Sequence, residues 1–429
     1  MKTPIFDAVK RYSDSDTVRA HMPGHKGRGA LGIEKYDLTE IDGLDVLYSA
    51  SGVIEESENN ASELFGTAHS YYSTEGSTLA IKAMLAITLY SRKSDTPPTV
   101  LAARNVHKAF ISAAALLDFE PVWLLGKGNH VCISHITADD VSDALSGMEN
   151  KPMAVYVTSP DYLGNMLDIE GIARVCDEYS VPLLVDNAHG AYFAFLDESE
   201  HPIAKGAAMC ADSAHKTLPV LTGGAYLHVS NKYSHLTKWA RSALSLFAST
   251  SPSYLILSSL DLANRYISDG YRERLSAFVK KVDAIKAKHS LDATEPLKIV
   301  LRGNYADELR RMGIECEFAD SDYTVLMLTP ENESDLDKID EALSSLDLAP
   351  MHLPAEIKMP YPETVMSVRE ATLSDFDEID VQAAEGRVCA ALAVSCPPAV
   401  PIAVSGERIT HEHIALFERY GTEKIKVVK

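Results

Sequence analysis

The chain has 429 residues, of which 40 are lysine or arginine and 61 are aspartate or glutamate, so its formal net charge is −21. This length predicts two or three domains, and the acidic balance argues against nucleic acid or an anionic membrane as the main partner. No apolar run is long enough for a signal peptide or a transmembrane helix. The six scattered cysteines include no C-x-x-C pair, which favours reduced thiols in the cytoplasm.

The first forty residues are predicted to form an arm, with a short helix over Ile5–Tyr12 followed by the loop "HMPGHKGRG". From about Glu58 to Ser230, predicted helices alternate with predicted strands. The predicted strands are 98–104, 151–160, 181–190, 207–216 and 223–230, and the predicted helices among them are 78–90, 108–119 and 169–180. Continuous apolar strands separated by helices are typical of a mostly parallel sheet covered on both faces. The sequence therefore predicts an α/β fold.

A long helical stretch over 252–289 is predicted to connect this large domain to a smaller α+β domain. That domain is expected to contain two strands within 315–329 and a helix over 333–346. The proline-rich segment 353–364 is predicted to cross between parts of the fold, and 396–410 to be a loop, because its prolines cannot donate to a sheet. The predicted boundaries are 1–40 for the arm, 41–290 for the large domain with its connecting helix, and 291–429 for the small domain.

A Ser/Thr/Gly cluster, "STEGST", runs directly into the predicted buried helix over 78–90. Backbone N–H groups at a helix N-terminus and nearby hydroxyls together favour an anion such as a phosphate. An ordinary N-cap is the alternative interpretation, since Ser and Thr are preferred there in any case.

Four further side chains lie near the carboxyl ends of predicted strands, where open α/β sheets bind ligands. Asp186 ends an apolar strand and could face a cationic ring nitrogen, with His189 three residues further on. His107 opens a helix and could stack on a flat ring, and Lys216 has glycines nearby and suits Schiff-base chemistry. Each residue alone could be structural. Together with the phosphate cradle, they occur in the order expected for pyridoxal phosphate (PLP).

With these motifs the chain resembles the ornithine/lysine/arginine decarboxylase family, PLP enzymes of the aspartate-aminotransferase fold (fold type I). The resemblance is to the short bacterial form without an N-terminal receiver-like domain. The matching stretches, which cover nearly the whole chain, are "HMPGHKG", "EIDGLDVLYSASGVIEESENNASELFG", "STEGST", "RNVHKA", "TSPDYLGNMLDI", "VDNAHGAY", "SAHKTLP", "MSVREA" and "GRVCAALAVSCPPAVPIAVSGERI".

The resemblance implies a PLP-dependent transferase fold with a seven-stranded-type sheet and a homodimer or higher oligomer with active sites at the subunit interface. It implies decarboxylation of a basic L-amino acid, with arginine slightly favoured over lysine and ornithine, through a Schiff base on Lys216. Asp186 would face the pyridine nitrogen, His107 would stack on the ring, and His189 would lie beside the phenolic oxygen or the substrate carboxylate. The residues implied for the phosphate are Gly76, Ser77, Thr78, Ser213 and His215.

The chain departs from the family at three positions. Cys396 and Ala399 stand where the family commonly has tyrosine and glycine, and Glu75 stands where asparagine is usual. These departures leave the substrate open. The alternatives are another PLP enzyme of this fold, an aminotransferase or a lyase, or a catalytically silent PLP-fold protein that binds a ligand or partner.

The sequence leaves three smaller points open. The group that returns a proton to Cα could be Lys216 or His107. His21, His25 and Lys26 of the arm could reach a partner subunit's site or form a structural turn. The motif "HEH" at His411–His413 has no third ligand at a useful spacing, so it is predicted to be surface and no metal site is expected.

Overall fold

The computed structural model describes the whole chain apart from residues 293, 349–358 and 391–398. The described chain divides into two compact units, formed by Met1–Lys93 with Leu183–Arg274 and by Ser94–Pro182 with Leu275–Lys429. Each unit combines two separate stretches of the chain, whereas each predicted domain is one continuous stretch. The units therefore do not test the predicted domain boundaries, which stay a prediction. Cys396 lies outside the described residues.

The first unit is built on four strands in the order β1-β7-β6-β5. β5 and β6 are parallel, whereas β7 is antiparallel to both β6 and β1. The strands are β1 (His69–Ser73), β5 (Leu183–Asp186), β6 (Met209–Asp212) and β7 (Ala225–Val229). The helices are α1 (Pro4–Ser13), α2 (Val53–Phe65), α3 (Gly76–Ser91), α7 (Ala214–Thr217), α8 (Thr237–Phe247) and α9 (Tyr254–Ser268).

Helix α3 forms the centre of this unit's core. It packs against β1, β6 and β7 on one side and against α8 on another. Its buried residues therefore lie all around the helix, as the sequence "TLAIKAMLAITLY" predicts for a helix that is apolar on nearly every face. This packing fixes the N-terminus of α3, and with it the "STEGST" segment.

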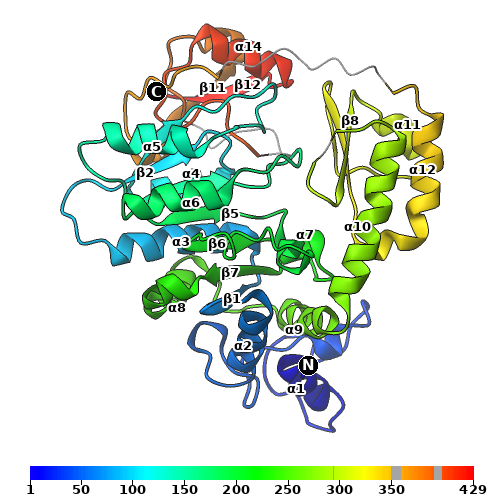
Figure 1. The fold of residues 1–429 in the computed structure, drawn as a ribbon. Helices are drawn as coiled ribbons and strands as arrows, with labels where there is room; N and C mark the ends of the chain where they lie inside the picture. The colour runs from blue at the N-terminus through cyan, green and yellow to red at the C-terminus, as the bar shows by residue number, and fades with distance from the viewer. Residues whose placement is uncertain (293, 349–358, 391–398) are drawn as a thin grey trace. The chain divides into compact units, whose positions relative to one another are not determined.

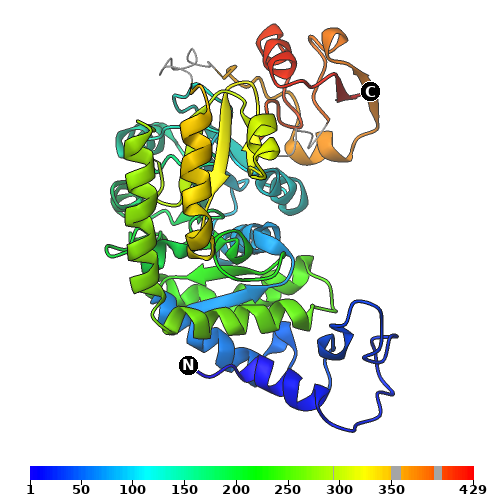
Figure 2. The same cartoon turned by 90° about the vertical axis from the view of Figure 1, so that its right-hand side faces the viewer.

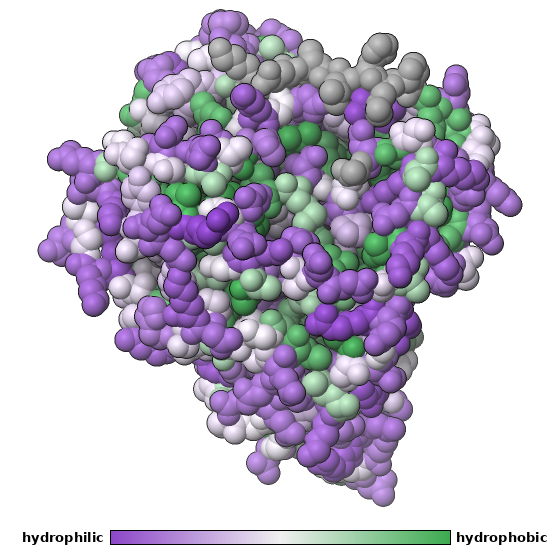
Figure 3. Space-filling model, viewed as in Figure 1, coloured by the Kyte–Doolittle hydropathy of each residue, from purple (hydrophilic) through white to green (hydrophobic). Residues whose placement is uncertain are grey.

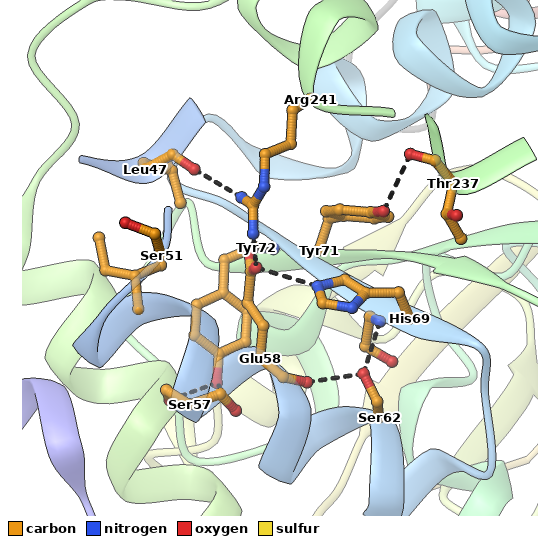
Figure 4. Close-up of polar contacts among 12 residues, drawn as sticks. Leu47, Ser51, Ser57, Glu58, Ser62, His69, Tyr71, Tyr72, Thr237 and Arg241 are labelled. Carbon is orange, nitrogen blue, oxygen red and sulfur yellow. Dashed lines mark hydrogen bonds and ion pairs between the residues drawn. The ribbon is translucent and has the colours of Figure 1, made fainter. Parts of the chain in front are cut away.

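A buried carboxylate, Glu58 of α2, joins α2, β1 and α8 (Figure 4). Its Oε2 accepts a hydrogen bond of 2.6 Å from Arg241 of α8 and lies 3.1 Å from Nε2 of His69, while its Oε1 accepts the N–H of Tyr72 at 3.0 Å. Arg241 also donates to the Leu47 carbonyl at 2.7 Å. A buried charge with this many partners holds the surrounding elements in one arrangement.

Helix α1 confirms the short helix predicted within the arm and lies alongside α9 (Figures 1 and 2). Its N-terminal turn is fixed by Asp261 of α9, whose Oδ2 accepts the N–H of Phe6 at 2.9 Å. The other carboxylate oxygen of Asp261 accepts the Ser57 hydroxyl at 2.6 Å, so one buried side chain attaches α1 and α2 to α9.

The second unit contains three strands in the order β4-β2-β3. The central strand β2 pairs in parallel with β3 and with β4. The strands are β2 (Thr99–Ala103), β3 (Glu120–Leu124) and β4 (Ala154–Thr158), and the helices beside them in sequence are α4 (Lys108–Leu117), α5 (Ala138–Gly147) and α6 (Ile169–Glu178). Each helix begins at a capping side chain, namely His107, Thr137 and Asp168. The strands and helices in both units confirm the predicted α/β fold with mostly parallel strands.

The rest of the second unit follows α10 (Tyr271–Lys288), within which the boundary between the units falls. Two small antiparallel sheets follow, β8-β10-β9 and β11-β12. Their strands are β8 (Lys298–Arg302), β9 (Phe318–Ala319), β10 (Tyr323–Met327), β11 (Phe376–Asp380) and β12 (Lys424–Val428), and the helices are α11 (Ala306–Arg311), α12 (Leu336–Ser345), α13 (Val368–Leu373) and α14 (His411–Arg419). The two strands predicted within 315–329 and the helix predicted over 333–346 are confirmed.

The helical stretch predicted over 252–289 is confirmed and consists of two helices, because the chain turns through Gly270 with a φ of +69°. Three other sequence predictions were wrong in detail. The strand predicted over 207–216 ends at Asp212, and the next residues form the short helix α7. The strand predicted over 181–190 ends at Asp186. His413 is 1% exposed rather than on the surface, because its ring caps the start of α14 and accepts the N–H of Thr410 at 3.1 Å.

In the described part of the chain, no helix combines the length and the apolar character needed to cross a lipid bilayer. On the face of the molecule drawn in Figure 3, hydrophilic residues predominate, with smaller apolar areas between them.

Candidate active site

Lys216 and His189 lie together in the first unit. Lys216 belongs to α7, directly after β6, and its Nζ is 3.0 Å from Nε2 of His189. His189 follows β5 and is only 5% exposed. Because β5 and β6 are adjacent and parallel, their carboxyl ends bring this amine and this imidazole to the same edge of the sheet.

Asp186 lies at the same edge, as the last residue of β5. The side chain is buried, with 2% of the residue exposed, and its Oδ1 accepts the N–H of Ala188 at 3.2 Å. A carboxylate at this ligand-binding edge of the sheet can hold a positively charged group.

The residues predicted for the phosphate meet at the start of α3. The Ser213 hydroxyl donates to the Ser77 hydroxyl at 2.7 Å, and Thr78 is the next residue of the same helix turn. Gly76, with a φ of +70°, begins the helix, and a Cβ there would meet no atom within 4 Å. The helix has 16 residues, so its first N–H groups and its dipole add to the hydroxyls in favouring an anion.

His215 lies close to this group. Its Nδ1 is 3.0 Å from the Gly224 carbonyl, so this nitrogen carries the proton and donates. Glu75 occupies the N-cap position of α3 and accepts the N–H of Ser249 at 2.7 Å. The carboxylate of Glu75 is therefore attached to the segment before α9.

These residues fit PLP. The paired hydroxyls and the open space beside Gly76 suit a phosphate, the Lys216 amine suits an aldehyde, and the buried Asp186 carboxylate suits a protonated pyridine nitrogen.

His107 lies in the second unit, at the carboxyl end of β2. It is the N-cap of α4, and its Nδ1 accepts the N–H of Ala109 at 3.1 Å. The main chain near it is tied to the C-terminal part of the chain, since the N–H of Lys108 donates to the Ala399 carbonyl at 3.0 Å. The predicted stacking of His107 on the cofactor ring stays a prediction.

The histidines of the arm bond within the arm. Nε2 of His25 is 3.1 Å from Asp37, Tyr12 lies against His21, and Lys26 adopts a φ of +54° in the turn. These contacts account for "PGHKG" as a structural turn. A contribution of these residues to a partner subunit's site stays a prediction.

Sequence reasoning missed a buried network around Asp212, the last residue of β6. Its Oδ2 accepts from Nε2 of His201 at 3.0 Å and lies 3.2 Å from Nε2 of His228, and its Oδ1 accepts from the Asn187 amide at 2.8 Å. Burial raises the pKa of Asp212, but the two imidazoles outweigh it and hold the pKa well below its ordinary value.

This network connects the two strand ends that carry the candidate cofactor residues. Asn187 follows Asp186 and Asp212 precedes Ser213, so the amide–carboxylate bond joins the end of β5 to the end of β6. The one sequence signal was an aspartate at the end of an apolar strand, in "AAMCAD".

An α/β fold with a lysine and a buried aspartate at the carboxyl ends of neighbouring strands, beside a hydroxyl-lined helix N-terminus, is the arrangement of fold type I PLP enzymes. The chain belongs to the Orn/Lys/Arg decarboxylase family: residues 3–309 match the family's major domain and residues 351–420 its C-terminal domain. It is a decarboxylase of this family, which acts on basic amino acids.

Two bacterial relatives match nearly the whole chain. The chain is similar to the arginine decarboxylase of Bacillus subtilis strain 168, with 28% identity over 96% of this chain and 92% of the relative. It is also similar to the uncharacterized protein YaaO of the same organism, with 29% identity over 100% of this chain and 96% of the relative.

Solved structures of lysine decarboxylases have the same fold. The Francisella novicida enzyme LdcF gives a TM-score of 0.78 at 18% identity and covers 100% of this chain and 81% of its own. The Pseudomonas aeruginosa lysine decarboxylase A gives 0.79 at 15% identity over 99% and 80%. These likenesses confirm the predicted fold type.

Proposed function

We propose that the protein removes carbon dioxide from arginine, or else from lysine or ornithine, using PLP bound through a Schiff base to Lys216. The family supports a basic amino acid as substrate. The observation that carries the cofactor assignment is the 3.0 Å contact of the Lys216 amine with His189, at the sheet edge that also holds Asp186. When bound, PLP supplies an electron-accepting ring that takes up the charge left at Cα.

The protein's own residues have separable tasks in this proposal. The hydroxyls of Ser77, Thr78 and Ser213, together with Gly76 and His215, hold the phosphate. Asp186 keeps the pyridine nitrogen protonated by placing a negative charge beside it.

Two imidazoles complete the proposed site. His189 accepts a hydrogen bond from the Lys216 amine and can take its proton, which leaves the amine nucleophilic. His107 stacks on the ring, and the proton returned to Cα comes from Lys216 or His107. A homodimer in the cytoplasm, with active sites at the subunit interface, is part of the same proposal.

A substrate screen tests the reaction. Purified PLP-loaded protein is supplied with arginine, lysine and ornithine, and carbon dioxide and the product amine are measured. Release of both from at least one substrate, most rapidly from arginine, supports the proposal. Conversion to a keto acid without carbon dioxide would instead identify an aminotransferase, and retained PLP without any turnover would identify a silent binding protein.

A labelling experiment tests the lysine. Borohydride reduction of the PLP-loaded protein fixes the cofactor to the lysine that holds it, and peptide mapping then identifies the residue. The label should be on Lys216 and should disappear in Lys216→Ala. A label on Lys26, Lys82 or Lys108 would overturn the assignment.

A further inference from the structure

The buried carboxylate of Asp212 has no task in the proposed reaction, although it lies between the residues that carry it. Asp212 ends β6, and one turn of α7 separates it from Lys216, whose N–H donates to the Ser213 carbonyl at 3.0 Å. On the other side, Oδ1 of Asp212 accepts the amide of Asn187 at 2.8 Å, directly after the neighbouring strand β5. Both side chains are completely buried, so this hydrogen bond joins the two strand ends from inside the protein.

Two imidazoles hold the Asp212 side chain in its charged form. Nε2 of His201 and Nε2 of His228 lie 3.0 Å and 3.2 Å from its Oδ2, and together they lower the pKa of Asp212. Cys210, 3.8 Å from Oδ1, and Tyr226 are the other titratable side chains close to it, and burial raises the pKa of both, so they stay neutral. A hydrogen bond to a charged acceptor is stronger than one to a neutral acceptor. The Asn187 amide is therefore held in one orientation.

The main chain of Asn187 begins the turn that carries His189. Its N–H donates to the Ala211 carbonyl at 3.0 Å, and its carbonyl accepts the N–H of Gly190 at 2.9 Å. A Cβ at Gly190 would lie only 2.1 Å from Oδ1 of Asn187, so the Asn187 side chain lies directly against this turn. Fixing the Asn187 amide therefore fixes the turn over 187–190 and the position of His189.

The contact between His189 and Lys216 depends on two short segments, the turn after β5 and the helix α7 after β6. Nε2 of His189 is 3.0 Å from Nζ of Lys216. The last pair in the ladder between β5 and β6 is Asp186 with Ala211, so the hydrogen bond from position 187 to position 212 continues the connection one residue further. This bond is next to both segments that form the contact.

We propose that Asp212 is a positioning residue for the reaction, and that it acts through Asn187 to keep the His189 imidazole in contact with the Lys216 amine. The tasks of His189 and Lys216 rest on the proposed function, whereas the contacts among these four residues do not. Without the hydrogen bond to Asp212, the turn is free to move, and the Lys216 amine loses an acceptor that stabilises its charged form.

Competitive labelling of the full chain, freed of PLP, measures this contact without any turnover. An amine reagent is supplied at a series of pH values, and the label on the peptide that contains Lys216 is quantified. The pH at which Lys216 is half reactive does not depend on how accessible the amine is. In Asn187→Ala this pH should fall by about one unit, the scale of one lost hydrogen bond to a charged group, because the ammonium loses its acceptor.

The PLP-loaded protein measures the consequence for the reaction. In Asn187→Ala, kcat for arginine should fall at least about tenfold, because a misplacement of about 1 Å can cost about a hundredfold in rate. KM should stay close to that of the parent, because neither Asn187 nor Asp212 is open to the substrate. A purely structural hydrogen bond would lower Tm without this change in kcat.

An exchanged pair provides a second test that does not depend on the folding of Asn187→Ala. Asn187→Asp alone sets two buried carboxylates against each other and should lower Tm and kcat further. Adding Asp212→Asn restores an amide–carboxylate hydrogen bond with the two sides reversed, and the amide oxygen at position 212 still accepts from His201 and His228. The double variant should therefore recover most of the Tm, the kcat and the labelling pH of the parent.

Glu58 provides a matched control, because it is an equally buried carboxylate with several partners. Those partners, Arg241, His69 and Tyr72, belong to α8 and β1 rather than to β5, β6 or α7 (Figure 4). Glu58→Gln should lower Tm but leave both kcat and the labelling of Lys216 unchanged.

Three results would overturn the positioning role. They are an Asn187→Ala protein with a lower Tm but an unchanged kcat and labelling pH, a double variant that recovers nothing relative to Asn187→Asp, or the same changes at Lys216 in Glu58→Gln. Failure of the proposed function is a separate outcome, because absence of carbon dioxide release would leave the predicted labelling pattern of the PLP-free variants intact.

Discussion

Ala399 adopts a backbone conformation that favours glycine. Its φ is +59°, and its carbonyl accepts the N–H of Lys108 next to His107. For a residue with a Cβ, this left-handed conformation costs about 1–2 kcal/mol, which glycine avoids. The backbone conformation at position 399 therefore explains why glycine is common there in the family motif that this segment resembles.

We predict that Ala399→Gly raises the free energy of unfolding, or leaves it unchanged, with a net gain of at most about 1 kcal/mol, because glycine's greater freedom in the unfolded chain offsets part of the relief. Urea unfolding measures this. The control is Ala284→Gly, at an exposed position inside α10, which should destabilise by about 1 kcal/mol. Equal destabilisation by the two substitutions would contradict the conformational argument.

His413 provides a second residue-scale prediction. Burial, and then the charge of Arg104, lowers the pKa of His413 to about 4 from its ordinary value of 6.5. Below pH 6.5 the unfolded chain takes up a proton that the folded chain refuses until about pH 4, so this residue's contribution to stability is lost as the pH falls through that window.

His413→Gln keeps an acceptor for the N–H of Thr410 and removes the titration. Between pH 6.5 and 4 the free energy of unfolding should therefore fall less in this variant than in the parent, by up to about 3 kcal/mol. His411→Gln is the control, because the His411 side chain is 76% exposed. The same pH dependence in parent and His413→Gln protein would rule out a neutral buried His413.

Asp186→Asn tests the carboxylate at the end of β5. The amide keeps the size of the side chain but cannot supply a negative charge beside a pyridine nitrogen. We expect PLP to stay bound, as judged by its absorbance, and kcat to fall by roughly two or more orders of magnitude, the scale for removing one preorganised charge. A kcat close to that of the parent would remove Asp186 from the mechanism.

At the scale of the element, the attachment of α1 depends on the buried carboxyl group of Asp261. Burial raises the pKa of Asp261 to about 6, against the hydrogen bonds from Ser57 and Phe6. The negative charge of Asp7, on α1, also raises the pKa of Asp261. The folded chain therefore holds a proton on Asp261 that the unfolded chain has lost, and stability should fall as the pH rises from about 4 to 6.

Asp261→Asn should remove this fall, which amounts to roughly 3 kcal/mol over the window. Unfolding curves at half-unit pH steps measure it, with Asp269→Asn as the control at the exposed end of the same helix. If the parent and Asp261→Asn proteins lose stability equally over this range, Asp261 is ionised in the folded chain throughout.

Much of the element order could be predicted, since apolar runs separated by helical patterns define β5, α3 and α4 locally. The position of Asp186 at a strand end follows from the same runs. The change from β6 to α7 within "CADSAHK" could not be predicted, because the segment is short and its small residues suit either structure. Lys216 therefore lies on a helix rather than at the end of a strand.

The network around Asp212 could not be predicted from the local sequence either, for a different reason. His228 reaches Asp212 because β7 is antiparallel to β6 in a register that pairs Cys210 with His228. His201 comes from a loop between strands. Neither contact leaves a trace in residue spacing, because pairing register is set by packing over the whole sheet.

For the whole molecule, the net charge of −21 bears on a substrate of opposite sign. Summed negative charge raises the local concentration of a cation and its rate of encounter, and salt screens this effect over about 10 Å at 0.1 M. We predict that kcat/KM for arginine falls several-fold between about 20 mM and 500 mM NaCl, mostly through KM, because the chemical step takes place away from bulk ions.

Norleucine, which has no side-chain charge, serves as the control: as a competitive inhibitor, its Ki should change little over the same range. If KM for arginine is independent of salt, the protein's overall charge does not contribute to substrate capture, and recognition of the basic end depends on contacts within the site alone.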